Sequence, residues 1–378
     1  MKFILAPDKY KGSLTGREFC VIVARGIQKV IPNAEIVSRP LADGGDGTID
    51  VVKDYLNASV VSTKVKDPFF REITVPYLLS ADQQTAFIEM SEASGYKLLH
   101  KWEMNCMHTT TFGTGEMIVD ALEKGAKHIV LGIGGSATND GGMGMAAALG
   151  FEFLDKEGQV LEPVGKHLSQ VFTINADQVH PKLKEVKIEV ACDVTNPFYG
   201  NQGAAHVYGP QKGASVEEVA ILDQGLKHFA RVLHSTFNID VQQIQGAGAA
   251  GGLGGGAVVF LNAELVSGVD LVMEMAQFEQ VLKGADWVIT GEGQLDGQTL
   301  SGKTINGVIK AANQNQVPVA AFCGSVDVNL DQMESLGLDY AVSILNQIGN
   351  LDDAKANTVQ NLELAAYNFA RLLKRSML

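Results

Sequence analysis

The sequence contains only four cysteines, and they lie far apart, at Cys20, Cys106, Cys192 and Cys323. Structural zinc sites need cysteines or histidines at close spacing, and disulfide-rich scaffolds need a much higher density of cysteine. The pattern therefore excludes both classes. We expect reduced thiols in a cytoplasmic protein.

Positive charge is also scarce. The 378 residues include 30 lysines and arginines against 43 aspartates and glutamates, which gives a net charge of −13, and the basic residues form no long run. Because nucleic-acid-binding proteins usually carry a basic patch, this class is excluded. An anionic substrate would have to be bound by a few well-placed cations and by backbone N–H groups.

Long hydrophobic runs are missing as well. The longest uncharged stretch, GAGAAGGLGGGAVVFLNA, is dominated by glycine and is a poor candidate for a membrane span. The N-terminal segment MKFILAPDKYKG has an apolar run before Pro7 and Asp8 that is too short for a signal peptide. We therefore expect a cytoplasmic protein with no membrane partner.

Glycine, in contrast, is abundant, with 41 residues, and several glycine-rich loops lie between strand-like and helix-like segments. Near the N-terminus the apolar run KFILA precedes a loop and a helical pattern, which a capping box of Thr15 and Glu18 opens. The last third repeats this order with ADWVIT, GEGQLDGQTLSGKT and INGVIKAANQN. Alternating strands and helices predict a parallel sheet with helices on both faces.

The middle of the chain follows a different pattern. It mixes crossover-like segments with hairpin-like strands such as FREITVPYLLS and QTAFIEM. Because the two ends of the chain share one pattern, we predict that residues 1–64 and 285–378 form one α/β domain. Residues 65–284 would then form an inserted domain of mixed α/β structure.

The predicted strands end in loops that combine glycine with acidic or hydroxyl residues, at 6–13, 42–48, 132–142, 192–197 and 290–296. Ligands of open α/β sheets bind at the carboxyl ends of the strands. Glycines let backbone N–H groups approach a phosphate, and carboxylates can hold Mg²⁺ or orient a hydroxyl. One such loop could be only a tight turn, but the set together indicates phosphoryl transfer.

Two strings match nucleotide-binding patterns without the expected context. GAGAAG (246–251) fits G-x-G-x-x-G, but that motif follows a strand, and the preceding NIDVQQIQ is a weak strand pattern. A glycine-rich turn or anion-binding loop is the favoured interpretation. GQTLSGKT (297–304) fits G-x-x-x-x-G-K-[ST], yet GEGQLD separates it from the predicted strand ending at Thr290. We predict an accidental match and no P-loop fold, with Thr304 starting or capping the next helix.

Taken in order, the loop sequences resemble those of the type I glycerate kinase family: APDKYKGSLT, PLADGGDGT, FGTGEMI, LGIGGSATNDGGMGMAAALG, CDVTNPFYGNQGAAHVYGPQKGA, GAGAAGGLGGG and TGEGQLDGQTLSGK. The resemblance runs nearly end to end and looks like that of a bacterial member. It implies a Rossmann-like domain built from both chain ends and an inserted mixed α/β domain. It also implies phosphorylation of D-glycerate by ATP with Mg²⁺, giving 2-phosphoglycerate, with 3-phosphoglycerate as the alternative product.

We expect the active site in the cleft between the two domains. The candidate catalytic residues are Asp193, Lys9 and Asp43. The candidate contacts of substrate or phosphate are Lys11, Ser13, Gly44, Gly45, Gly134, Gly135, Ser136, Thr138, Asn139, Asn196, Gly291 and Lys303. The candidate metal ligands are Asp46, Glu292 and Asp296. For any one of them the alternative is a solvated lysine or an acid that stabilises a turn.

Two other functional classes stay open on the residues alone. A nicotinamide-dependent hydroxy-acid dehydrogenase would use GAGAAG, and a non-catalytic binding protein would release no ADP with any small hydroxy acid. The division of roles among the acids, between general base and metal ligand, is open at this point.

Overall fold

The computed structural model describes residues 1–10, 12–42, 48–296 and 304–376 of the chain. They form two compact units. The first unit joins both ends of the chain, Met1–Asp43 and Val269–Leu378, and the second is Gly44–Gly268. In the described part of the chain, no helix is long and apolar enough to cross a membrane.

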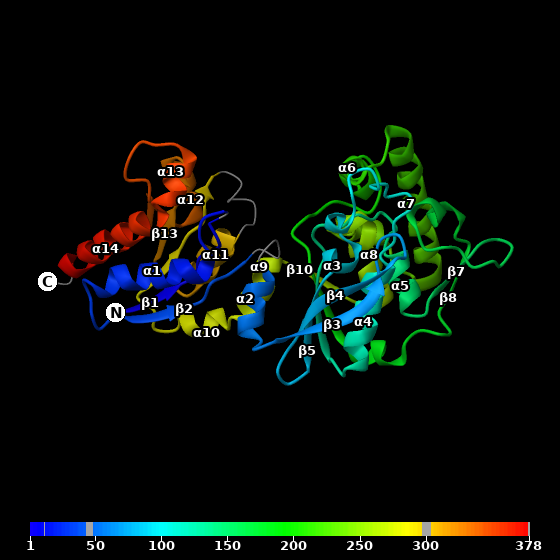
Figure 1. Ribbon diagram of the computed structural model, residues 1–378, viewed down its shortest axis with the longest axis horizontal. Helices are drawn as coiled ribbons and strands as arrows, with labels where there is room; N and C mark the ends of the chain where they lie inside the picture. The colour runs from blue at the N-terminus through cyan, green and yellow to red at the C-terminus, as the bar shows by residue number, and fades with distance from the viewer. Residues whose placement is uncertain (11, 43–47, 297–303, 377–378) are drawn as a thin grey trace. The chain divides into compact units, whose positions relative to one another are not determined.

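The first unit is built on a five-stranded parallel sheet with the order β15-β13-β11-β1-β2. Figure 1 labels its strands β1, β2 and β13. Its strands are β1 (Lys2–Leu5), β2 (Glu35–Ser38), β11 (Trp287–Thr290), β13 (Val319–Cys323) and β15 (Tyr340–Ser343). The N-terminal strand β1 lies between β2 and β11, so it pairs with strands from both ends of the chain. A separate parallel pair is formed by β12 (Gln294–Leu295) and β14 (Ser325–Val326).

Helices cover both faces of this sheet, as a parallel sheet requires. Helices α1 (Gly16–Gln28) and α14 (Thr358–Ser376) pack together and share a core with Phe3 and Leu5 of β1. Because side chains alternate along a strand, Ile4 points to the opposite face, and there α11 (Thr304–Gln314) contacts β11 and β13. The remaining helices are α9 (Gly268–Met275), α10 (Phe278–Leu282), α12 (Leu330–Leu336) and α13 (Leu351–Ala356).

The second unit contains a six-stranded mixed sheet with the order β10-β9-β6-β5-β4-β3. Strands β10, β9, β6 and β5 are parallel neighbours, whereas β4 pairs antiparallel with β5 and β3. The bounds are β3 (Ser59–Lys66), β4 (Glu72–Leu79), β5 (Thr85–Glu89), β6 (His128–Gly132), β9 (Lys187–Ala191) and β10 (Glu264–Val266). A separate antiparallel pair is formed by β7 (Glu152–Leu154) and β8 (Thr173–Asn175).

The helices of the second unit are α2 (Thr48–Tyr55), α3 (Ser91–Ser94), α4 (Phe112–Glu123), α5 (Met143–Ala148), α6 (Ala204–Tyr208), α7 (Val216–Phe237) and α8 (Ala249–Leu261). Two of the helix starts have simple local causes. The predicted capping box of α1 is present, since the Glu18 amide donates to Thr15 Oγ1 at 3.2 Å and the Thr15 amide donates to Glu18 Oε2 at 2.8 Å. Ser215 and Glu218 form the same reciprocal cap on α7.

The predicted fold class is confirmed, since a parallel-sheet unit made from both chain ends accompanies a mixed α/β unit. The bounds of the units differ from the predicted domain bounds. β3 pairs along its whole length with β4, so residues 48–64 belong to the second unit, and residues 269–284 belong to the first. A strand or helix pattern identifies an element but not the sheet that it joins, which is why the sequence misplaced these segments.

Candidate active site

The order of the first sheet defines one point where ligands are expected. Across the sheet the strands lie in the order β2-β1-β11-β13-β15. The chain passes from β1 to β2 on one side and from β11 to β13 on the other, so the connections leave β1 and β11 in opposite directions. A doubly wound sheet binds its ligand at such a switch point, outside the carboxyl ends of the two strands. The residues that follow these ends are Asp8 and Lys9 after β1, and Gly291 and Glu292 after β11.

Asp8 is the best-anchored acid at this point. Thr304 Oγ1 donates to Asp8 Oδ2 at 2.6 Å, the Lys9 amide donates to Asp8 Oδ1 at 2.6 Å, and the Asp8 amide donates to the Gly291 carbonyl at 2.9 Å. Thr304 is the first residue of α11 and is fully buried. Asp8 is thus fixed between the two loops that leave the switch point, with a carboxylate oriented by a hydroxyl.

Glu292 lies in the same surroundings and is 8% exposed. Burial is the main cause that raises the pKa of the Tyr10 phenol well above its usual value. The Cys323 thiol and the negative charge of Glu292 add to the rise. Tyr10 donates its hydroxyl to the Phe322 carbonyl. We call Asp8, Tyr10, Glu292 and Thr304 the switch-point cluster.

Gly291 is a glycine for a packing reason. A Cβ at this position would lie 2.1 Å from the Phe322 carbonyl oxygen, so the two backbones could not approach as they do. The structure therefore gives Gly291 a role in joining β11 to β13, while its predicted contact with substrate stays a prediction.

The second group of polar residues follows β6 in the other unit. Gly134 and Gly135 are exposed, and Gly135 has a φ of +72°, which a residue with a side chain would adopt only under strain. Just after them, the buried Ser136 hydroxyl and the Thr138 carbonyl accept hydrogen bonds from Lys212 Nζ, at 2.6 and 2.7 Å.

Thr138 and Asn139 carry polar atoms whose hydrogen bonds the protein does not satisfy. Both side chains are fully buried, and the Thr138 hydroxyl and both polar atoms of the Asn139 amide have no protein partner among the described residues. Buried polar atoms are nearly always hydrogen-bonded, so these are positions for water or for a ligand. We call Ser136, Thr138, Asn139 and Lys212 the glycine-loop cluster.

Asp193 follows β9, which lies next to β6 in the parallel part of the sheet. The loops after these two strands therefore leave the same edge. Asp193 is exposed, and its Oδ1 accepts the Gly268 amide at 3.0 Å, where α9 begins. Asn196 mainly stabilises its own loop, because its side-chain nitrogen donates to the Gln202 carbonyl at 2.9 Å and its side-chain oxygen accepts the Tyr208 hydroxyl at 2.6 Å.

Of the other candidates, two lie in the described part of the chain and six lie outside it. Ser13 donates its hydroxyl to Thr358 at 2.9 Å, and Asp296 follows β12 in a half-buried position. Among the residues that the structure describes, no group of three or more acids, histidines or cysteines is arranged to hold a metal ion. The candidates that lie outside the described residues are Lys11, Asp43, Gly44, Gly45, Asp46 and Lys303.

The two nucleotide-binding patterns lack their usual context. β12 lies between the end of β11 and the string GQTLSGKT, of which residues 297–303 are outside the described part, so the string does not spring from the end of β11 as a P-loop does. GAGAAG follows a 3₁₀ turn at Val241–Gln243 where a dinucleotide-binding motif has a strand.

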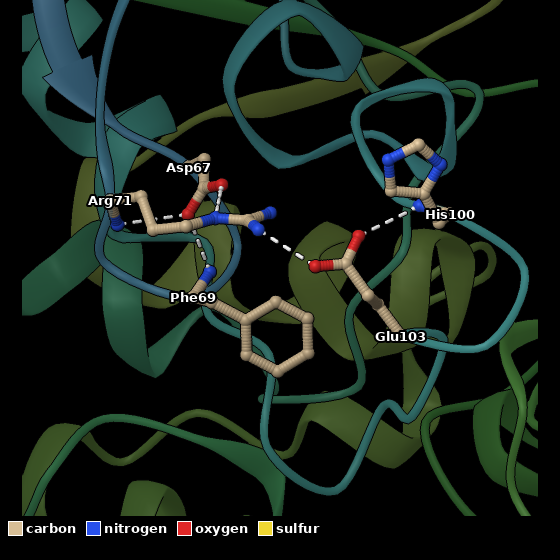
Figure 2. A network of polar contacts seen from close by, with 5 residues as sticks. All are labelled: Asp67, Phe69, Arg71, His100 and Glu103. Carbon is tan, nitrogen blue, oxygen red and sulfur yellow. Dashed lines mark hydrogen bonds and ion pairs between the residues drawn. The ribbon is translucent and has the colours of Figure 1, made fainter.

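A third polar network has a structural character. Figure 2 shows the Arg71 guanidinium between two carboxylates: Nε pairs with Asp67, and an Nη donates to Glu103 at 2.7 Å. Glu103 also accepts the His100 amide at 2.9 Å. Arg71 is 48% exposed. The network joins the β3–β4 turn to the loop at 100–103, and these contacts do not include a residue of the switch-point cluster or of the glycine-loop cluster.

Glu292 and the loop at 134–139 are candidates from the sequence that also lie in the two clusters, whereas Asp8 and Lys212 are candidates from the structure alone. Both lie in the loop strings APDKYKGS and YGPQKGA, and neither has a pattern that marks it among other aspartates and lysines. Their partners lie 296 and 76 residues away, so only the fold reveals them.

Comparison with known proteins agrees with this fold. The profile of the glycerate kinase family matches residues 3–374. A Halalkalibacterium halodurans protein named glycerate kinase is 44% identical, covering 97% of each chain. An Escherichia coli K12 protein named glycerate 2-kinase is 40% identical, covering 100% of this chain and 99% of its own. A crystal structure from Salmonella typhimurium LT2, described as a glycerate kinase 2, superposes with a TM-score of 0.89 at 39% identity, covering 100% of this chain and 99% of that one. The chain therefore belongs to the glycerate kinase family of phosphotransferases.

Proposed function

We propose that this protein transfers the γ-phosphoryl group of ATP to the 2-hydroxyl of D-glycerate, giving 2-phosphoglycerate and ADP. The observation that carries the proposal is the family match over residues 3–374, together with 40% identity over the full chain to a protein named glycerate 2-kinase. The product 3-phosphoglycerate is the alternative. The dehydrogenase alternative has no support from the 3₁₀ turn that precedes GAGAAG.

In this reaction the glycerate hydroxyl oxygen forms a bond to the γ-phosphorus, and the bond from that phosphorus to the bridging oxygen of ADP breaks. The hydroxyl proton leaves to a base. Catalysis of phosphoryl transfer rests on positioning and on stabilising charge, more than on covalent chemistry. We assign the base to Asp193, because it is exposed at the carboxyl edge of a parallel strand and its Oδ1 is held by the Gly268 amide.

The switch-point cluster fits a magnesium ion by the chemistry of its donors. Mg²⁺ prefers oxygen ligands, and the carboxylates of Asp8 and Glu292 with the Thr304 hydroxyl supply them. Asp46 and Asp296 remain proposed ligands from the sequence. When bound, Mg²⁺ neutralises charge that develops on the phosphates. The chain's own part is to hold the Asp8 carboxylate in place through Thr304.

Anionic groups of the substrates would bind at the glycine loops. The exposed backbone of Gly134 and Gly135 and the buried Ser136 hydroxyl are suited to a phosphate or carboxylate, and Lys9 is the proposed cation at the switch point. The further proposed contacts are Lys11, Ser13, Asp43, Gly44, Gly45, Thr138, Asn139, Asn196, Gly291 and Lys303. Placement of the reaction in a cleft between the two domains is part of this proposal.

The direct test measures ADP release with D-glycerate, L-glycerate and no acceptor, each with and without Mg²⁺. We expect ADP release only with ATP, Mg²⁺ and glycerate together, and much slower release with the L enantiomer. A parallel assay with NAD and D-glycerate should show no change in absorbance. Turnover with NAD and none with ATP would overturn the proposal.

A further inference from the structure

Lys212 is a buried cation in the second unit. It is 4% exposed and ends the 3₁₀ turn Pro210–Lys212. Its ammonium donates to Ser136 Oγ and to the Thr138 carbonyl, both of which are neutral. An ammonium has three hydrogens to donate, and among the described residues the third has no acceptor.

The charged and titratable groups that face this ammonium are Cys106 and Asp140. Burial raises the pKa of the Cys106 thiol to about 11, so the thiol is neutral. The buried Asp140 carboxylate is already hydrogen-bonded by the Thr111 amide and hydroxyl and by the Gly142 and Gly144 amides. Lys212 therefore keeps its charge with no close ion-pair partner among the residues that the structure describes, and desolvation lowers its pKa to about 8.

If Lys212 only tied the loop at 134–139 to the turn at 210–212 through hydrogen bonds, its charge would not be needed. Burying an ion without a close partner costs stability, and a neutral side chain could fasten the loop at a lower cost. What the ammonium adds is positive charge beneath a loop that exposes the backbone of Gly134 and Gly135. The same loop holds the Thr138 hydroxyl and the Asn139 amide, which have no hydrogen-bond partner within the described ranges. A cation and unsatisfied polar groups in one loop are suited to receiving an anion.

We propose that Lys212 is a positioning residue for an anionic substrate group. It fixes the backbone of the loop at 134–139 and supplies the positive charge that favours a carboxylate or phosphate there. The inference rests on the proposed function for the identity of that anion, which is either the carboxylate of glycerate or a phosphate of ATP.

The test compares Lys212→Met with Lys212→Arg and with a matched control, Lys182→Met. Lys182 Nζ donates to the Leu122 and Glu123 carbonyls, at 3.1 and 3.4 Å, so it also fastens backbone, but at the end of α4. Lys212→Met should lower kcat/KM by about 10²-fold, as misplacement of a binding loop does. The KM that rises identifies the anion, glycerate or ATP. Lys212→Arg should recover part of the loss, and Lys182→Met should lower Tm with unchanged kinetics.

Two further readouts separate positioning from mere cross-linking. Lys212→Met should keep a Tm within a few degrees of the wild type, because removing a buried charge offsets the lost hydrogen bonds. The wild-type kcat/KM should fall as the pH rises through about 8, and Lys212→Arg should move that fall to higher pH, since arginine stays charged. Wild-type kinetics in Lys212→Met would overturn the proposal. If that variant does not fold, an unchanged pH profile in Lys212→Arg would overturn it.

A binding measurement keeps this inference apart from the proposed function. The rise in Tm produced by ATP alone and by D-glycerate alone needs no turnover. One of these rises should shrink in Lys212→Met and persist in Lys182→Met. If the wild type fails to phosphorylate glycerate, the proposed function fails, and the loss of a ligand-induced rise would still support the anion site. Equal rises in all variants would contradict it.

Discussion

The switch-point cluster and the glycine-loop cluster solve opposite electrostatic problems. The first gathers the carboxylates of Asp8 and Glu292 beside hydroxyls, and Asp8 is held by hydrogen bonds from Thr304 and the Lys9 amide. In the second, the ammonium of Lys212 donates to neutral acceptors, and within the described part of the chain the neighbouring Thr138 hydroxyl and Asn139 amide have no partner. An acid-rich site suits a metal ion with its phosphates, and a cation beneath exposed glycines suits a bare anion. The two proposed sites therefore differ in the charge that they present: carboxylates at the switch point, and one ammonium, with the buried Asp140 carboxylate nearby, at the glycine loop.

The largest effect is expected from Asp193→Asn. Asn keeps an oxygen that can accept the Gly268 amide, so the turn should survive while the charge is lost. As a lost general base, the variant should show kcat lowered by about 10³-fold at an unchanged Mg²⁺ requirement, measured by steady-state kinetics over a range of Mg²⁺. Partial recovery at high Mg²⁺ would make Asp193 a metal ligand instead. Near wild-type kcat and KM would show that it only stabilises the turn.

The next largest effect on kinetics is expected from Asp8→Ala, which tests the proposed role of the switch-point cluster. We expect kcat/KM to fall by about 10²-fold at low Mg²⁺ and to recover in part at high Mg²⁺, because the variant loses an oriented carboxylate. Asp240→Ala is the matched control, since Asp240 is an exposed loop acid that accepts the Gln242 amide at 3.1 Å. If Asp8→Ala behaves like Asp240→Ala, the switch point does not hold the metal.

Thr304→Ala should have a smaller effect. The hydroxyl donates to a carboxylate, and such a hydrogen bond contributes about 1.5–3 kcal/mol, so its loss should lower kcat/KM by about 10-fold or more. Thr304→Ser should restore most of the activity. A role limited to starting α11, which the sequence alone predicted, would leave the kinetics of Thr304→Ala close to the wild type.

The effect of pH on stability tests whether Lys212 is buried as a charged group in the glycine-loop cluster. Below about pH 8 the ammonium of Lys212 is charged in both the folded and the unfolded chain, so the full cost of burying it is present. Between about pH 8 and the ordinary value of 10.5, the folded state releases this proton first, and this group's contribution to the free energy of unfolding rises with pH. Urea unfolding of the wild type minus that of Lys212→Met should show this slope. A flat difference across that range would mean that the pKa of Lys212 is not lowered.

The smallest kinetic effect is expected at the network of Figure 2. Arg71→Met removes the partner that Asp67 and Glu103 share, so Tm should fall modestly while kcat and KM stay unchanged. Arg71 is half exposed, and surface ion pairs contribute little. A kinetic change comparable to that of Thr304→Ala would mean that this network supports a functional loop.

The sequence predicted the parts of the fold that depend on local patterns. The capping box at Thr15, the strand KFILA and the glycine loop after β6 each follow from residues close together in the chain. Pairing across the chain was less accessible, so β3 was assigned to the wrong domain.

The candidate site residues divide in the same way, into those marked by local sequence patterns and those that depend on distant partners. Glu292 and Ser136 lie in strings that mark a loop at a strand end, so spacing alone suggested them. Asp8 is a candidate because of its hydrogen bond from Thr304, which is distant in the sequence, and only the structure shows that bond. Lys212 is a candidate because it is buried, and the sequence does not indicate this, since a lysine in YGPQKGA is expected at the surface. Residues whose role depends on a distant partner or on desolvation are therefore those that sequence reasoning missed.

The central claim is that this chain phosphorylates D-glycerate at its 2-hydroxyl, and identification of the product tests it most directly. The wild-type protein is incubated with ATP, Mg²⁺ and D-glycerate, and the phosphorus of the product is correlated with the glycerate protons by NMR. The account predicts a coupling between phosphorus and the single proton on C2, with one ADP formed for each phosphoglycerate. Coupling to the two C3 protons would contradict the product assignment, and recovery of unmodified glycerate would contradict the claim itself.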